Sequence, residues 1–244
     1  MNDTDTLIHS ARNLLSGTFH GILASHSEEM LGYPFGSLAP YSIAEDGWPL
    51  FLMSHLAKHT KNIDAAPQCS LTIIDQGPGD VQTQMRLTCL GDLLPAEWIT
   101  QEAIERHFRY FPQSRDYYEQ LNFRFYHLTP KRFYCVGGFG AARWLGVDRL
   151  THPLPFQADQ EIALIHALMQ EHSGLLNRWL AQHQLSPTPT SPASIIGIDS
   201  LGLDIRCADE LLRLPFIEPV AQAAKLNEAV IEALTHPDDN STVF

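Results

Sequence analysis

Apolar residues recur at helical spacing near the start of the chain, and a strand pattern follows. The positions that predict this first helix, which Gly17 ends, are Leu7, Ile8, Ala11, Leu14 and Leu15. Short apolar or alternating runs then predict strands at residues 19–24, 35–43, 48–53, 69–75, 84–94, 124–128 and 132–136. One helical stretch, at about 96–120, interrupts these strands.

Turn residues suggest how the strands connect. Asp46-Gly47 predicts a turn that joins the runs 35–43 and 48–53 into a hairpin. Pro130, between Thr129 and Lys131, is expected to separate the last two strands, because proline lacks the amide through which a strand pairs. About six strands with two or three helices favour a closed or split β-barrel, since a doubly wound parallel sheet would need helices between most strands.

The chain after residue 152 has a different pattern. A long amphipathic helix is predicted over 159–182, a hairpin over 194–199 and 203–207, and a final helix over about 219–234. Pro153 and Pro155 stiffen the segment before the long helix. We therefore predict an α+β protein with two domains, a split β-barrel over residues 1–152 and a small α+β domain over residues 153–244.

The charge is negative and unevenly distributed. The chain carries 16 basic and 28 acidic residues, a formal net charge of −12, which argues against general nucleic-acid or anionic-membrane binding. Residues 151–244 hold only 4 basic against 12 acidic side chains. This acidic tail suits a surface that faces a protein partner, or simply a solvated face. No apolar run reaches the ~18 residues of a membrane span.

The cysteines bear on the compartment. Cys69, Cys89, Cys135 and Cys207 are scattered without a CxxC pair, and three of them lie in apolar strand-like runs. We interpret them as reduced core residues. Together with the acidic first residues, which do not resemble a secretory or transit signal, they predict a cytoplasmic protein.

The segment Ser54–Asn62 collects polar groups after a predicted buried strand. It offers two lysines, two imidazoles, two hydroxyls and an amide within nine residues. Amides at a helix start, with Lys58 and Thr60, would suit a phosphate monoester. His55 and His59, at i and i+4, also allow metal binding, although a zinc site needs a third protein ligand. A polar helix end that faces solvent is the third interpretation.

Two further features could contact a ligand. The run Val136–Gly140 is rich in glycine at a strand end, so its backbone could approach a flat ligand or make a tight bend. It lacks the spacing of a dinucleotide fingerprint. Arg86 lies within an otherwise apolar strand, and it therefore needs an anionic partner or an outward position.

Five segments, in one order along the chain, resemble a known family. They are Gly32–Pro40, Ser54–Asn62, Arg86–Thr88, Leu128–Pro130 and Gly138–Ala142. Together they are similar to the flavin-binding split barrel related to pyridoxamine 5′-phosphate oxidase, in its haem-utilisation (HugZ/HutZ-like) branch. The tail resembles the small domain of unknown function that is often fused behind such barrels.

The resemblance implies a homodimer with a small-molecule cofactor, FMN or haem, in clefts that both chains form. The residues that it implies as cofactor-binding are Ser54, Lys58, His59, Thr60, Asn62, Arg86, Gly138 and Gly140. For FMN, the segment Ser54–Asn62 would hold the phosphate. For haem, His59 and Arg86 would lie near the pocket, and a histidine past the barrel, here His152, would bind the iron.

Two departures from the family pattern leave the function open. The strand Phe35–Leu38 lacks the arginine with which oxidase relatives bind phosphate, and Asn122 stands where haem-degrading relatives have an aspartate. We therefore expect a flavin- or haem-dependent oxidoreductase, with FMN and haem equally open. The alternative is a barrel that kept its shape as a non-catalytic interaction protein, for example one that binds an enzyme of tetrapyrrole synthesis. A protein partner for the acidic domain fits either case.

Overall fold

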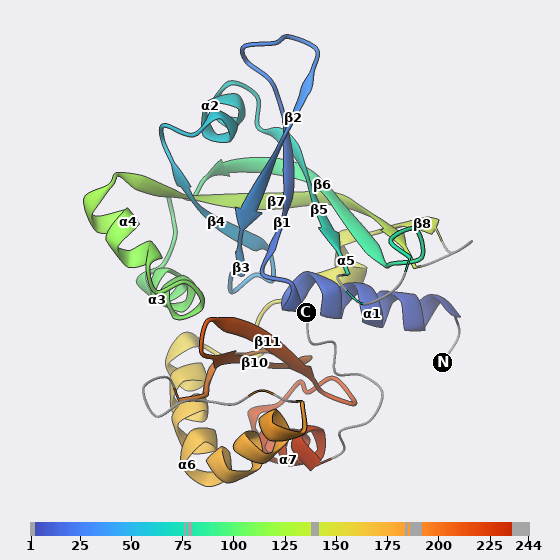
Figure 1. Cartoon of the computed structure of the whole chain (residues 1–244), viewed down its shortest axis with the longest axis vertical. Coiled ribbons are helices and arrows are strands. Elements are labelled where there is room, and N and C mark those ends of the chain that lie inside the picture. Colours follow the sequence, from blue (N-terminus) through green and yellow to red (C-terminus); the bar gives the residue numbers. More distant parts are fainter. Residues whose placement is uncertain are drawn as a thin grey trace. The chain divides into compact units, whose positions relative to one another are not determined.

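The protein is described by a computed structural model that covers residues 3–75, 77, 80–137, 142–183, 185 and 192–235 (Figure 1). Contacts between Cα atoms divide the chain into two compact units, Met1–Pro153 and Leu154–Phe244. Each unit has its own sheet and its own helices.

An antiparallel sheet forms the centre of the first unit. Among the described residues it has eight strands in the order β2-β1-β5-β6-β7-β4-β3, with β8 paired to β7. The strands are β1 (His20–His26), β2 (Pro34–Pro40), β3 (Ser42–Ile43), β4 (Pro49–Ser54), β5 (Gln68–Ile74), β6 (Arg86–Pro95), β7 (Phe123–Val136) and β8 (Ala142–Leu145). Alternate residues of the central strands point into a buried core that includes Leu23, Leu71, Leu87, Cys89 and Phe133.

Helices surround this sheet (Figure 1). They are α1 (Asp3–Gly17), α2 (Lys58–Ala65), α3 (Gln101–Tyr110), α4 (Ser114–Gln120) and α5 (Val147–Leu150). The apolar side of α1 is buried through Leu7, Ala11 and Leu14, as its spacing predicted. Ile104 and Phe108 of α3 pack on Leu50 and Phe125, so α3 covers one part of β4 and β7.

Three local predictions for this unit need correction. The strand expected at 35–43 is two strands, of which β2 pairs with β1 and only β3 forms the predicted hairpin with β4. The strands expected at 124–128 and 132–136 are one strand, β7, because the ladder with β6 continues past Pro130 after a register shift at Leu90/Gly91. Gly91 has no side chain, and a Cβ there would collide with the Thr129 carbonyl oxygen, so it makes room for this irregular pairing. The helical stretch at 96–120 is two helices, α3 and α4, separated at Pro112.

The second unit is a small α+β module. It contains α6 (Ala158–Gln182), β9 (Ser194–Ile198), β10 (Gly202–Cys207), β11 (Glu210–Pro215), the short 3-10 helix η1 (Ala223–Lys225) and α7 (Leu226–Thr235). Its sheet has the order β11-β10-β9 and packs against Leu176, Trp179 and Val230 of the two α-helices. β11 was not predicted, because Arg213 breaks its apolar pattern. The last helix begins at Leu226, later than the predicted start near residue 219.

Arg213 is a charged residue that is buried inside this module, because two carboxylates compensate its charge. Its side chain is 2% exposed and donates hydrogen bonds to Asp199 at 2.6 Å and to Asp204 at 2.8 Å. Asp199 also accepts from the amides of Leu201 and Gly202, at 2.7 and 3.0 Å, which fixes the β9–β10 turn. The two carboxylates raise the pKa of Arg213, so this buried cation stays charged.

The predicted fold class is therefore confirmed. The first unit is a split β-barrel, the second is a small α+β domain, and the whole is an α+β protein. All four cysteines are free, and Cys89, Cys135 and Cys207 are buried. Within the described ranges, no helix is both long and apolar enough to cross a membrane.

Candidate cofactor site

The segment that was singled out in the sequence forms the end of β4 and the start of α2. Ser54 is the last residue of β4, and its Oγ accepts a hydrogen bond from the Leu56 amide at 3.2 Å. Ala57 precedes the helix and has no side-chain acceptor with which to cap it. The first-turn amides of Lys58 and His59 therefore lack a side-chain cap, at the end of the helix that favours negative charge.

The hydroxyl of Thr60, in the first turn of α2, is buried without a hydrogen-bond partner among the described residues. The residue is 1% exposed, and its Oγ1 makes no hydrogen bond among the described residues. A buried hydroxyl in this state costs about 1–3 kcal/mol. Such a cost in the free protein can be recovered when a bound group supplies the missing partner.

Asn62 is buried and holds the end of β1 in place. Its Nδ2 donates to Ser25 Oγ at 3.1 Å, and its Oδ1 accepts from the Glu28 amide at 3.0 Å. Both ends of the amide are thus occupied within the chain. Asn62 positions the neighbouring strand, and a direct contact to a cofactor would require it to give up one of these bonds.

Lys58 is exposed at the surface, and His59 lies just beneath it. The exposed Lys58 ammonium forms an ion pair with Glu29 from the loop between β1 and β2, and it holds the pKa of that carboxyl below its usual value. Because this pair is exposed, it stabilises the fold little and leaves Lys58 able to exchange partners. His59 is partly buried, and burial lowers its pKa, so the imidazole is neutral at pH 7.

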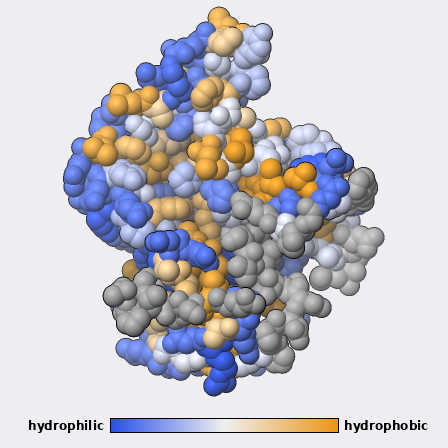
Figure 2. Space-filling view, in the orientation of Figure 1, coloured by the Kyte–Doolittle hydropathy of each residue, from blue (hydrophilic) through white to orange (hydrophobic). Residues whose placement is uncertain are grey.

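The side of the sheet that faces away from the core carries exposed apolar residues beside polar and charged ones such as Arg86 and Arg132. We call it the outer sheet face. One row crosses six strands through Leu38, Ile22, Thr72, Thr88, Tyr134 and Trp144. Leu38 is 67% exposed and Trp144 48%. Figure 2 also shows hydrophobic side chains at the tip of the β1–β2 hairpin, where Leu31 is 85% exposed. Exposed apolar side chains that gather on one face in this way are typical of an interface.

A pocket of about 400 Å³ opens beside this face, between β1, β5 and β6. We call it the outer-face pocket. Its lining includes His26, Cys69, Leu90 and Lys131, together with Ser25, to which Asn62 is bonded. Lys131 pairs with Asp92 at 3.0 Å. Burial beside Asp92 raises the pKa of Cys69 to about 12, so its thiol is protonated and unreactive at pH 7.

Arg86 lies on the same face of the sheet. It pairs with Ile74 of β5 and with Val136 of β7, and its side chain is half-buried. Along β6 it is four residues from Leu90 in the outer-face pocket, a separation of about 13 Å. The strand register therefore gives Arg86 an outward position, one of the two arrangements that its sequence context allowed.

His152 and Ser54 are not among the described residues that line the outer-face pocket. The backbone of His152, which follows α5, lies against Gly47 in the turn between β3 and β4. Gly47 permits this close approach because it has no side chain, and its φ is +84°. Ser54 is at the opposite end of β4. Burial and nearby Arg12 lower the pKa of His152. Gly138 and Gly140 lie outside the described residues.

Sequence reasoning missed His26 and Lys131. His26 was detectable, because it continues the outward alternation of Ile22 and Ala24 along β1. Lys131 was assigned to a break between two strands, whereas β7 is continuous there. As for a metal centre, the described part of the chain contains no group of three or more His, Cys, Asp or Glu side chains placed to hold an ion.

The fold defines the class of this protein, the split β-barrels. Residues 3–152 match the family described as "CREG, beta-barrel", and the chain belongs to that family. The split-barrel resemblance inferred from sequence motifs is thereby confirmed. The match ends where the second unit begins, and it says nothing of that unit.

Similar proteins extend over both units. A chloroplastic heme oxygenase of Arabidopsis thaliana, HOZ, is 24% identical over 96% of this chain and 74% of its own. A protein of unknown function from Agrobacterium tumefaciens, Atu2129, is 23% identical with a TM-score of 0.68, covering 92% of this chain and 94% of its own. A heme binding protein from Mycobacterium smegmatis is 23% identical with a TM-score of 0.55, covering 95% and 97%. At these identities the two structures support the fold alone.

Proposed function

We propose that the protein is a homodimer that binds haem between the outer sheet faces of two subunits and acts as an oxidoreductase in haem breakdown. The observation that carries the proposal is the outer sheet face itself, which leaves an apolar surface uncovered beside a pocket with an imidazole and a cation. The similarity to a heme oxygenase over 96% of the chain supports haem as the ligand.

The residues present fit haem. Haem is a flat, mostly apolar ring with an iron ion at its centre and two carboxylate groups at one edge. His26 in the outer-face pocket would provide the iron ligand, and Lys131 the counter-charge for a carboxylate. Leu90 and the apolar residues of the second subunit would cover the ring and exclude water. Bound haem would supply the electron chemistry, while these side chains bind and orient it.

His152 stays the other proposed iron ligand. It lies at the β3–β4 turn and is exposed, so it is accessible to haem only if the cleft extends to that end of β4. Replacing each histidine separately distinguishes the two positions.

FMN is the second candidate cofactor, and Thr60 is the observation that favours it. A buried hydroxyl without a partner, at an uncapped helix start beside Lys58, matches the donors that a phosphate needs. The lack of a cation on Phe35–Leu38, where oxidase relatives bind the phosphate, weighs against FMN. We therefore favour haem over FMN as the cofactor.

The experiment is an absorbance titration of the purified protein with hemin and, separately, with FMN. We expect a saturable haem band that the variants His26→Ala and Lys131→Ala weaken at least tenfold, with His152→Ala unchanged. Loss of the band in His152→Ala alone would transfer the ligand role to that residue. Saturable FMN binding that Lys58→Ala and Thr60→Val abolish would select the flavin instead.

A stability measurement separates the flavin argument from simple misfolding. Thr60→Val should stabilise the free protein by about 1 kcal/mol, because it removes a buried hydroxyl that has no partner. The matched control is Thr18→Val, which removes a hydroxyl that donates to the Leu14 carbonyl at 2.8 Å and should destabilise by about 1 kcal/mol.

Uptake of neither compound by a folded protein would favour the non-catalytic interaction protein. The cytoplasm remains the proposed compartment, which the four free thiols support.

A further inference from the structure

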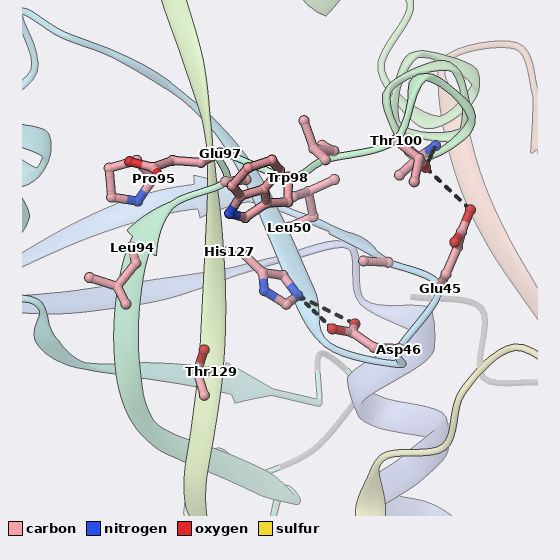
Figure 3. Close-up of a pocket in the computed structure, with 14 residues that line it drawn as sticks. Glu45, Asp46, Leu50, Leu94, Pro95, Glu97, Trp98, Thr100, His127 and Thr129 are labelled. Atoms are coloured by element: carbon pink, nitrogen blue, oxygen red, sulfur yellow. Dashed lines mark hydrogen bonds and ion pairs between the residues drawn. The ribbon is translucent and has the colours of Figure 1, made fainter.

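A second pocket lies in the first unit where the start of α3 meets β4, β6 and β7 (Figure 3). We call it the α3 pocket. Its volume is about 380 Å³, within the range of small-molecule sites. The turn between β3 and β4 and the connection from β6 to α3 supply most of its walls. Nothing in the proposed haem function uses it.

The interior of the α3 pocket is apolar. Leu50 and Ala103 are buried residues of its lining, and Ile99 packs against the buried cluster to which Leu50 belongs. Leu94, at the edge, is 47% exposed. Trp98 also lines the pocket, and its side chain is 93% exposed, an unusual state for the largest apolar side chain. An indole in this position offers a flat surface to an incoming ligand.

The charged groups of the α3 pocket are all acidic. Glu45, Asp46 and Glu97 line it, and none of the described residues in its lining is a lysine or arginine (Figure 3). The Asp46 carboxylate is held in place, because it accepts from the Trp48 amide at 3.0 Å and lies 3.1 Å from His127 Nε2. Glu45 accepts from the Thr100 hydroxyl at 3.4 Å. Glu97 is exposed, with its carboxylate open to solvent.

We propose that the α3 pocket binds a small organic cation, an ammonium group attached to an aromatic or aliphatic body. The carboxylates attract and pair with the ammonium, the indole of Trp98 adds a cation–π contact, and the apolar interior takes the hydrocarbon part. The same charges repel haem and FMN, which carry carboxylate or phosphate groups. The α3 pocket and the proposed haem pocket therefore bind ligands of opposite charge.

The test is calorimetric titration of the full chain with three probes of one shape and different charge. They are 2-phenylethylammonium, 2-phenylethanol and 3-phenylpropanoate. We expect the ammonium to bind with a dissociation constant at least tenfold lower than that of the alcohol, and the carboxylate not to bind. Added salt should weaken the ammonium alone, because part of its affinity is electrostatic.

Variants locate the binding. Glu97→Gln should weaken the ammonium about three- to tenfold, and Trp98→Ala by a similar factor, because each removes one contact to the cation. The control Glu102→Gln removes an exposed carboxylate of the first turn of α3 that does not line the pocket, and it should leave the affinity unchanged. Equal binding of ammonium and alcohol, no binding of the ammonium, or equal effects of Glu97→Gln and Glu102→Gln would overturn the proposal. Hemin binding is measured alongside, and its failure would leave this result intact.

Discussion

His107 is a histidine kept neutral by its surroundings. It is 1% exposed, its Nδ1 is 2.8 Å from the Ser42 hydroxyl, and the rings of Phe111 and Phe125 lie against it. Burial lowers its pKa to about 3. In the unfolded chain the same group titrates near its ordinary value of about 6.5.

This difference predicts how stability depends on pH. Above about pH 6.5 the imidazole is neutral in both states, and its contribution is fully present. As the pH falls from there toward 3, only the unfolded chain takes up the proton, so the free energy of unfolding drops by up to about 1.4 kcal/mol per pH unit. His107→Gln should remove this part of the slope in urea unfolding followed between pH 7 and pH 4.

The control for this measurement is His166→Gln, on the exposed side of α6, which should leave the slope as it is. A wild-type slope equal to that of His107→Gln would mean that His107 is protonated in the folded protein, against its burial.

At the scale of single elements, the outer sheet face is the proposed contact between the two subunits. Ile22 and Leu38 are directly opposite each other on β1 and β2, and both are exposed. In the proposed dimer the same face of two subunits meets, so one substitution acts twice across the two-fold axis. A buried charge without a partner costs several kcal/mol.

Leu38→Glu should therefore raise the dimer dissociation constant at least a hundredfold, which sedimentation velocity over a range of concentrations measures. Hemin uptake should fall with the dimer. Leu121→Glu is the matched control, because Leu121 is 54% exposed at the end of α4 and does not belong to the row of residues that crosses the six strands. A wild-type protein that sediments as a monomer at all concentrations would reject the dimer and the shared cleft together.

At the scale of the whole molecule, the two units have separate cores. The second unit depends on Arg213, which is enclosed with Asp199 and Asp204. Removing one partner of a buried ion pair leaves the other charges uncompensated and typically costs about 3–5 kcal/mol.

Arg213→Met should therefore lower the free energy of unfolding of the second unit by about 3–5 kcal/mol. Hydrogen exchange should show faster exchange of the β9–β11 amides, while the β5–β7 amides of the first unit keep their protection. The control Arg178→Met replaces an exposed arginine of α6 and should change stability by less than about 0.5 kcal/mol. Equal loss of protection in both units would show that they unfold together.

Local patterns in the sequence were sufficient to predict the two kinds of architecture. Helical spacing in α1 and α6, and alternation in most of the strands, are local consequences of which side of each element is buried, so a linear pattern records them. It also identified the segment around α2 as polar and unusual. It failed where a distant contact overrides the local pattern, as at Pro130, which Gly91 accommodates, and at Arg213, whose charge two carboxylates satisfy.

The contacts of each candidate side chain, in contrast, depend on how distant parts of the chain pack together. The tertiary structure bonds Asn62 to Ser25 and Glu28, leaves the Thr60 hydroxyl without a partner among the described residues, and places His152 at the far end of β4 from α2. It also brings His26 and Lys131, 105 residues apart in sequence, into one pocket. The physical reason is strand register: which residues of two distant strands face each other depends on the pairing of the whole sheet, and no local pattern encodes it.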